Sequence, residues 1–485
     1  MEFKNEGFTT RIESFIEKYY YGILLCALLL PLFNLFFKLS SNAIQDWDEA
    51  RHGVTAFEMI KNNNFLVSTY GNSVDYYNFK PPLGMWAIAL SYKLFGYNAF
   101  ALRFFSAISS FFTVVIVSKI LKDNISKLAS IMGVVLLSTN YLFVNWHTGR
   151  TGDFDAGLAL LFTICMYFLL KTDRSIKNFY FTGLAFSVAF LLKSYATFQI
   201  VAVIGLILLV TGKLFRISFK EYVIFILCSF VPIFTWMTLR YRFDGIKFLK
   251  SMITYDVIAR STSTIEGHTG NILYYFKYLL RNNYYIVFFM LFILICYILL
   301  KKTKLQLLNN KFMKISIAVW TIVPFVLFSL SKSKLVWYIN PVHPALTILI
   351  VWSAYKLLGD KKVSNKLKAS IFIVFIICSL CGEASIVHKI NTDAMPSNQK
   401  DLISLANNGT IKGEDIYTEE WSQSNMFIAE VLDGLNPKQM NRNLFVKNKV
   451  QGLYLLDNNK DSKLFIDSSK LNIVMINNSY IIVKQ

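Results

Sequence analysis

Long apolar stretches recur along most of the chain and predict a protein that crosses a membrane many times. From residue 21 to about residue 388, runs of mostly apolar residues alternate with shorter polar segments. Runs of about 18 or more apolar residues are typical of membrane-spanning helices. The pattern predicts a polytopic α-helical membrane protein with about 11–13 transmembrane helices. We place eleven of them at about 21–39, 100–118, 128–146, 156–170, 178–192, 198–212, 221–239, 284–300, 313–330, 337–357 and 369–387.

The charge pattern orients these helices. The formal net charge is +20, and the lysines and arginines gather in short loops such as 119–127, 171–177, 213–220 and 361–368. Basic short loops are expected on the cytoplasmic side. The positive charge therefore indicates the topology of the helices. Since 54% of the residues are hydrophobic, we expect membrane lipids as partners and no nucleic acid.

This orientation places two long loops outside, at about 40–99 and 240–283. Within the first loop, residues 81–96 are apolar but short, and they include Lys93. If they crossed the membrane, every later basic loop would lie outside. We therefore expect an interfacial helix there.

The last hundred residues change character. They are polar and rich in Asn and Lys, with short strand-like runs at 452–457 and 471–484. We predict a transmembrane domain at 1–388 and a small extracytoplasmic α/β domain at 389–485. The six cysteines all lie in apolar segments and show no metal-ligand spacing, so we predict no metal site from them.

With this topology, unusual polar groups gather on the external face. They are Asp46, Asp48, Glu49 and Arg51 after the first helix, Lys80 before two prolines, Arg150, Asp153 and Asp155 in a second loop, Lys193 at a helix end, and Lys332, Lys334 and Tyr338 in a third loop. Each group alone is typical of a solvated surface or of a helix end. Together, cations beside carboxylates at the membrane edge suit a lipid-linked phosphate that carries a sugar. Cations stabilise the charge that grows on the phosphate, and a carboxylate can act as general base on an acceptor hydroxyl.

Several stretches resemble a known superfamily. The segment 46–96, with Asp48-Glu49-Ala50-Arg51 and Phe79-Lys80-Pro81-Pro82-Leu83, resembles the first external loop of the GT-C polyprenyl-phosphate-sugar-dependent glycosyltransferases. These include the protein O-mannosyltransferases and the lipid A aminoarabinose transferase. "GRTGDFDAGLALLF" (149–162) is similar to the second acidic loop of that superfamily, and "SKSKLVWYINPVHPAL" (331–346) to its lysine-to-tyrosine segment. Arg103 and Lys193 stand in two weaker matches, and the resemblance covers about residues 20–357.

The resemblance implies roles for individual residues. Asp48 would be the leading catalytic carboxylate and Asp155 its partner, with Glu49 and Asp153 as further catalytic candidates. Lys80, Lys193 and Tyr338 would bind the donor phosphate. Charge and location alone add Arg51, Lys332, Lys334, Arg260 and His268.

The resulting hypothesis is an integral-membrane glycosyltransferase. It would move a sugar from a polyprenyl-phosphate donor to an acceptor hydroxyl on a glycan, lipid or protein at the extracytoplasmic face of the cell membrane, with inversion. The sequence points to no particular cofactor, and metal need not be involved, but the two acidic loops could hold a divalent cation. Two alternatives stay open: a flippase for lipid-linked sugars, and an inactive assembly subunit.

Overall fold

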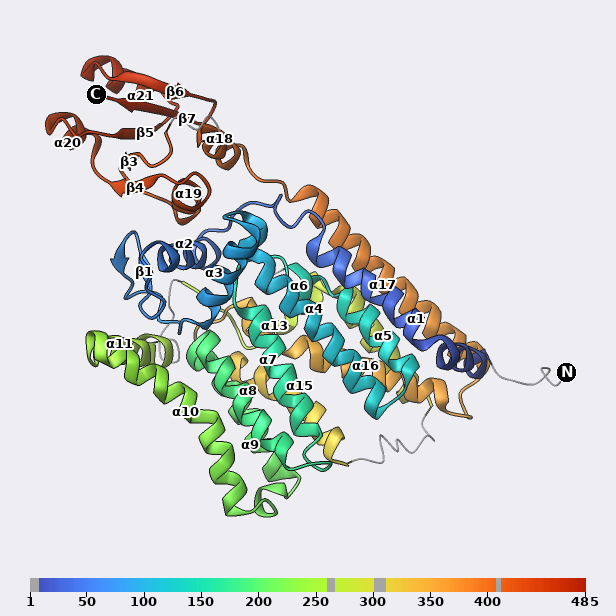
Figure 1. Cartoon of the computed structure of the whole chain (residues 1–485). Coiled ribbons are helices and arrows are strands. Elements are labelled where there is room, and N and C mark those ends of the chain that lie inside the picture. Colours follow the sequence, from blue (N-terminus) through green and yellow to red (C-terminus); the bar gives the residue numbers. More distant parts are fainter. Residues whose placement is uncertain (1–7, 146, 260–266, 301–310, 407–410) are drawn as a thin grey trace.

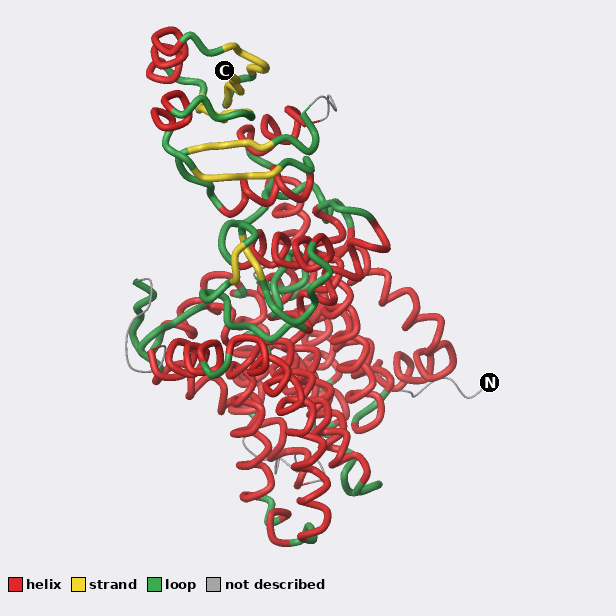
Figure 2. The backbone as a smooth tube through the Cα atoms, turned by 60° about the vertical axis from the view of Figure 1, so that its left-hand side comes forward, coloured by secondary structure: helices red, strands yellow, loops and turns green. Residues whose placement is uncertain are grey.

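The computed structural model of the chain describes residues 8–145, 147–259, 267–300, 311–406 and 411–485. A bundle of helices makes up most of the molecule, and a small region of strands and short helices caps one end (Figures 1 and 2). The predicted fold class, a polytopic helical membrane protein with a small C-terminal α/β region, is confirmed.

Among the described residues, seven helical segments are long and apolar enough to cross a membrane, or eight if α13 (Tyr274–Asn282) and α14 (Tyr284–Leu299), bent by 102°, form one span. Five of the seven are the long helices α4 (Ala99–Asn124), α10 (Phe219–Asp244), α15 (Lys311–Leu330), α16 (Val342–Gly359) and α17 (Asn365–Thr392). The other two are α1 (Phe8–Phe36) and a 34-residue segment, Lys177–Val210. Shorter apolar helices, among them α5 (Lys127–Ser138) and α7 (Asp155–Leu170), pack between the long ones.

The segment Lys177–Val210 folds back on itself. It consists of α8 (Lys177–Lys193), a 3-10 turn and α9 (Phe198–Val210). Lys213, just after α9, forms an ion pair with Asp173, just before α8. A straight helix of that length would hold these two residues about 50 Å apart, so α8 and α9 run antiparallel. Counted in this way, the eleven predicted helices correspond to α1, α4, α5, α7, α8, α9, α10, α14, α15, α16 and α17.

The first long loop contains two helices, and the hydrophobic pattern predicts only one of them. α3 (Leu83–Phe95) matches the predicted short apolar helix, whereas α2 (Asp48–Lys61) lies in a stretch that the sequence analysis left without structure. The Arg103 guanidinium in α4 donates to the carbonyl of Leu39, just after α1, at 2.9 Å. The chain therefore leaves α1 and enters α4 at the same end of the bundle. A single 13-residue helix cannot cross and return, so α3 lies at that end.

Other predicted elements differ in detail. The helix expected at 128–146 breaks after Ser138 and continues as the short α6 (Tyr141–Asn145). The expected loop at 240–283 holds α11 (Lys247–Ile253) and α13. In both places polar side chains at the ends of apolar runs form local hydrogen bonds, which an apolar pattern does not report.

The C-terminal region forms a five-stranded sheet in the order β4-β3-β5-β7-β6. β3 (Asp415–Thr418) pairs in parallel with β4 (Asn436–Gln439) and β5 (Leu453–Asp457), and β7 (Tyr480–Lys484) pairs antiparallel with β5 and β6 (Asn472–Ile476). The run at 471–484 is thus a hairpin. Helices α18 (Ser397–Ala406), α19 (Gln423–Phe427), α20 (Arg442–Lys447) and α21 (Lys460–Ser469) accompany the sheet. This region lies beside α2 (Figure 1), and the domain boundary at 388/389 stays a prediction.

Candidate active site

A cavity of about 740 Å³ opens at the end of the bundle where the first loop lies. One part of its wall is polar and charged, with Asp46, Asp48, Arg51, Lys80, His147, Asp155, Lys193 and Tyr338. Another part is apolar and comes from α7, α9 and α15, with Leu158, Phe198, Ala202, Leu327 and Phe328. Such a cavity can hold a ligand that has a charged head and a hydrocarbon tail.

Asp48 begins α2 and forms an ion pair with Lys80. The Lys80 ammonium donates to Asp48 Oδ1 at 2.8 Å and to His52 Nε2 at 3.1 Å. Partial burial alone would raise the pKa of Asp48, but the positive charges of Lys80 and Lys193 hold that pKa well below its usual range. Asp48 is therefore ionised at neutral pH, at the N-terminal end of a helix, where the helix dipole favours a negative charge.

His52 is neutral and carries its proton on Nδ1. Burial and the neighbouring Lys80 lower its pKa to about 4. Its Nδ1 lies 3.1 Å from the carbonyl oxygen of Gly152, and its ring stacks on Phe154 with centroids 4.0 Å apart. Because Nδ1 faces an acceptor and Nε2 faces an ammonium, one tautomer satisfies both contacts. His52 thus fixes the position of Lys80 relative to the second acidic loop.

The second acidic loop contributes two buried carboxylates. Asp155, at the first position of α7, forms an ion pair with Lys193 at the end of α8. Asp153 Oδ2 lies 3.1 Å from His147 Nδ1 in an ion-pair contact, and the His147 ring stacks on Trp337 with centroids 3.6 Å apart. Burial would lower the pKa of His147, but the charge of Asp153 raises it above its ordinary value. When protonated, His147 adds a positive charge to the cavity wall that also holds Lys80 and Lys193.

Asp48, His147 and Asp153 could together hold a metal ion. Each offers a ligand atom, and these atoms lie within 4.8 Å of one another. One oxygen of Asp153, a residue that is 1% exposed, has no hydrogen-bond partner among the described residues. The imidazole nitrogen and the carboxylate oxygens fit a divalent cation such as Mn²⁺ or Zn²⁺.

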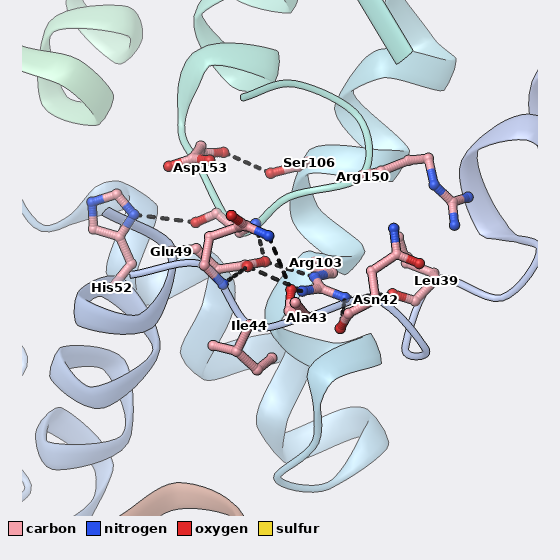
Figure 3. Close-up of polar contacts among 12 residues, drawn as sticks. Leu39, Asn42, Ala43, Ile44, Glu49, His52, Arg103, Ser106, Arg150 and Asp153 are labelled. Atoms are coloured by element: carbon pink, nitrogen blue, oxygen red, sulfur yellow. Dashed lines mark hydrogen bonds and ion pairs between the residues drawn. The ribbon is translucent and has the colours of Figure 1, made fainter. Parts of the chain in front are cut away.

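Glu49, one residue after Asp48, is absent from the cavity wall and lies in a buried ion pair (Figure 3). Its carboxylate accepts from Arg103 at 2.6 and 3.0 Å, and from the backbone N–H groups of Gln45 and Gly152 at 2.8 Å each. Arg103 also donates to the carbonyls of Leu39, Asn42 and Ala43. The pair thus connects the end of α1, the start of α2, α4 and the second acidic loop.

Arg51 lines the cavity but is held by other groups. Its guanidinium makes a bidentate contact with Asp75 at 3.0 and 2.8 Å and lies over the rings of Tyr70 and Tyr77. Tyr338 also lines the cavity and packs against Phe328. Lys334 is buried and donates to the carbonyls of Ser329 and Ser331. Lys334 itself is absent from the cavity wall.

The structure brings most of the sequence-predicted residues together. Asp48, Asp155, Lys80, Lys193, Tyr338, Arg51 and His268 share the cavity wall, and Asp153 lies directly behind it on His147. Glu49, Lys332 and Lys334 are absent from that wall, and Arg260 lies outside the described residues.

Sequence reasoning missed His52, His147 and Trp337. A histidine beside each acidic motif, in "DEARHG" and "WHTGRTGD", was a visible signal, since the described cavity uses both. The stacking of His147 on Trp337 joins segments about 190 residues apart, which no local pattern shows.

Comparisons with known proteins find similar sequences and similar folds. The sequence profile of the dolichyl-phosphate-mannose-protein mannosyltransferase family matches residues 79–236. An uncharacterized protein of Aquifex aeolicus is 28% identical over 327 residues, 66% of this chain and 71% of its own length. The undecaprenyl phosphate-alpha-4-amino-4-deoxy-L-arabinose arabinosyl transferase of Wigglesworthia glossinidia brevipalpis is 26% identical over 387 residues, 75% of this chain and 65% of its own length.

Solved structures share the fold. ArnT from Cupriavidus metallidurans bound to undecaprenyl phosphate superposes with a TM-score of 0.72 at 16% identity, covering 95% of this chain and 98% of the other. The oligosaccharyltransferase of Archaeoglobus fulgidus superposes with a TM-score of 0.54 at 11% identity, covering 92% and 70%.

Proposed function

Because the chain is a membrane glycosyltransferase of the GT-C superfamily, of the type that includes protein O-mannosyltransferases and lipid A aminoarabinose transferases, we propose that it uses a polyprenyl-phosphate-linked sugar as donor. The sugar would pass to an acceptor hydroxyl at the extracytoplasmic face, with inversion at the anomeric carbon. The observation that supports this most is the pairing of an ionised carboxylate, Asp48, with the ammonium of Lys80 in a cavity that also has an apolar wall. The relative from Wigglesworthia glossinidia brevipalpis is named for an undecaprenyl phosphate-linked aminoarabinose donor, and a donor of that class has the charged head and hydrocarbon tail that such a cavity can hold.

In the proposed complex the donor phosphate lies among Lys80, Lys193 and Tyr338, and the prenyl chain lies along Leu158, Phe198 and Leu327. The phosphate competes with Asp48 for the Lys80 ammonium. When Lys80 turns toward the phosphate, Asp48 loses the charge that depresses its pKa most strongly and becomes a better base.

The transfer step then balances as a single displacement. Asp48 takes the proton of the acceptor hydroxyl, the hydroxyl oxygen forms a bond with the anomeric carbon, and the bond from that carbon to the phosphate oxygen breaks. The phosphate keeps the electron pair and leaves as polyprenyl phosphate, its growing charge stabilised by Lys80 and Lys193. Asp155 holds Lys193 in place through their ion pair.

Both the reaction and the sidedness are open to test. Reconstituted protein is incubated with a radiolabelled polyprenyl-phosphate sugar, and both free polyprenyl phosphate and label inside liposomes are measured. We expect release of free polyprenyl phosphate; movement of intact donor without release would replace this proposal with a flippase. Single cysteines at exposed positions of the first loop, such as Tyr77, should react with an impermeant maleimide from outside the cell. Reaction only after permeabilisation would invert the proposed orientation.

A further inference from the structure

The C-terminal region contacts the catalytic helix α2 at a glycine. Gly53 follows His52 directly, and a Cβ added there would overlap the ring of Phe427 at the end of α19. Phe427 is fully buried, and the hydroxyl of Tyr92 donates to the carbonyl of Gly53 at 3.4 Å. The absence of a side chain at residue 53 therefore lets a ring from the C-terminal region reach the helix backbone one turn after Glu49.

A second contact holds the residue before the helix. Asp46 lines the cavity, and its Oδ1 accepts from the backbone N–H of Ser424 at 2.7 Å. Trp47, between Asp46 and Asp48, has a φ of 67°, a left-handed conformation that strains a bulky residue. Such a backbone persists only when its neighbours hold it. Ser424 does so on one side and Lys80, through Asp48, on the other.

A third contact grips the loop before Asp46. The side-chain amide of Gln399 in α18 accepts from the backbone N–H of Ile44 and donates to its carbonyl, each at 2.9 Å. Arg103 holds the same loop from the bundle side, through the carbonyls of Asn42 and Ala43. The start of α2 is therefore clamped between the helix bundle and the C-terminal region.

We propose that the C-terminal region is a positioning element of the active site: through Ser424 and Phe427 it fixes the start of α2 so that Asp48 faces the cavity. This inference rests on the proposed function for its catalytic meaning. Ser424 and Phe427 are absent from the cavity wall, so they act through Asp46 and Gly53. They are positioning residues, and the region they belong to is part of the catalytic unit.

The test uses the full chain. Ser424→Pro removes the backbone N–H that donates to Asp46. Ser424 is the second residue of α19, where the helix itself does not use that N–H. Ser424→Ala keeps the N–H and is the matched control. Asp46→Ala removes the bond from the other side, and Asp46→Asn keeps an oxygen acceptor. We expect Ser424→Pro, Asp46→Ala and Phe427→Ala each to lower kcat by about tenfold, with polyprenyl-phosphate binding unchanged, because Lys80, Lys193 and Tyr338 lie on other segments.

The double variant Asp46→Ala/Ser424→Pro should be no slower than the slower single variant, since both remove one bond. Asp46→Asn should lose less activity than Asp46→Ala, and Ser424→Ala, outside the cavity wall, should stay close to the wild type. An unchanged kcat in Ser424→Pro and Phe427→Ala, or additive losses in the double variant, would overturn the proposal.

Hydrogen exchange of residues 48–53 gives a readout that does not depend on the reaction. Phe427→Ala should raise exchange at the start of α2 and leave α4 and α7 as in the wild type. Exchange identical to that of the wild type would refute the positioning role. If the wild type releases no polyprenyl phosphate from any sugar donor, the proposed function fails, and the exchange data still decide whether the C-terminal region holds α2.

Discussion

The Lys80 ammonium lies 2.8 Å from Asp48 Oδ1 and 3.1 Å from His52 Nε2. The residue expected to bind the donor phosphate thus already pairs with the residue expected to take the acceptor's proton. Since the Lys80 ammonium cannot pair fully with both Asp48 and the donor phosphate, we expect donor binding to be coupled to the activation of Asp48 as a base.

Replacement of Lys80 should show how the positive charge of this side chain affects the pKa of Asp48. Lys80→Met removes the positive charge that lowers the pKa of Asp48, so that pKa rises. The acid limb of the pH–rate profile should then move to higher pH, and donor KM should increase. Lys80→Arg keeps the charge and should retain the wild-type profile. Values of kcat/KM report the free enzyme, in which Lys80 faces Asp48. From pH 4 to 9 the wild type and Lys80→Arg should show no acid limb, and a Lys80→Met profile that also shows none would mean that Asp48 does not titrate in the rate.

The Glu49–Arg103 pair should govern stability. Both side chains are buried, at 0% and 1% exposure, so Glu49→Gln leaves a buried guanidinium without its counter-charge. Removal of one partner of such a pair costs about 3–5 kcal/mol. We expect the thermal midpoint in detergent to fall by several degrees, and Glu49→Gln/Arg103→Met to lose less than the two single variants added together. Additive losses would mean that the two side chains act independently.

Much of this architecture could be predicted from the sequence. The features that could not be predicted depend on contacts between segments that are apart in the chain. Apolar runs located the helices, and basic loops placed Asp48, Lys80, Asp155 and Lys193 at one end of the bundle, where they share a cavity. α2 was not predicted, and the residues that it buries pack against α3, the next helix, and against α19, more than 360 residues further along the chain. Glu49 was chosen as a catalytic candidate for its place in the motif, and only its contact with Arg103, 54 residues away, shows a structural use.

The contact between α2 and the C-terminal region should respond to pH. Glu430 is buried, with Glu58 nearby and the Lys61 ammonium at 3.4 Å, and burial raises its pKa to about 7. Because the unfolded group ionises near pH 4.5, the folded form binds more protons between these values, and stability falls as pH rises from about 4.5 to about 7. Glu430→Gln should flatten this slope. Hydrogen exchange of residues 428–432 at pH 5 and pH 8 measures it; equal protection in the wild type at both values would contradict the assignment.

Metal removal tests the role of Asp48, His147 and Asp153. Lys80 pairs with Asp48, and His147 lies against Asp153, and the proposed step uses no metal ion. We expect donor cleavage to continue in EDTA. A loss of turnover that Mn²⁺ restores, and that His147→Ala abolishes, would instead assign a catalytic metal to these three residues.

The proposed mechanism depends on Asp48 as the general base. Release of polyprenyl phosphate from a labelled sugar donor tests this role most directly. Asp48→Asn should lower the rate by about 100-fold or more, with the protein folded and polyprenyl phosphate still bound. The exposed Asp173, at the other end of the bundle, provides the matched control, and Asp173→Asn should release at the wild-type rate. Equal turnover by Asp48→Asn and the wild type would contradict the proposed mechanism.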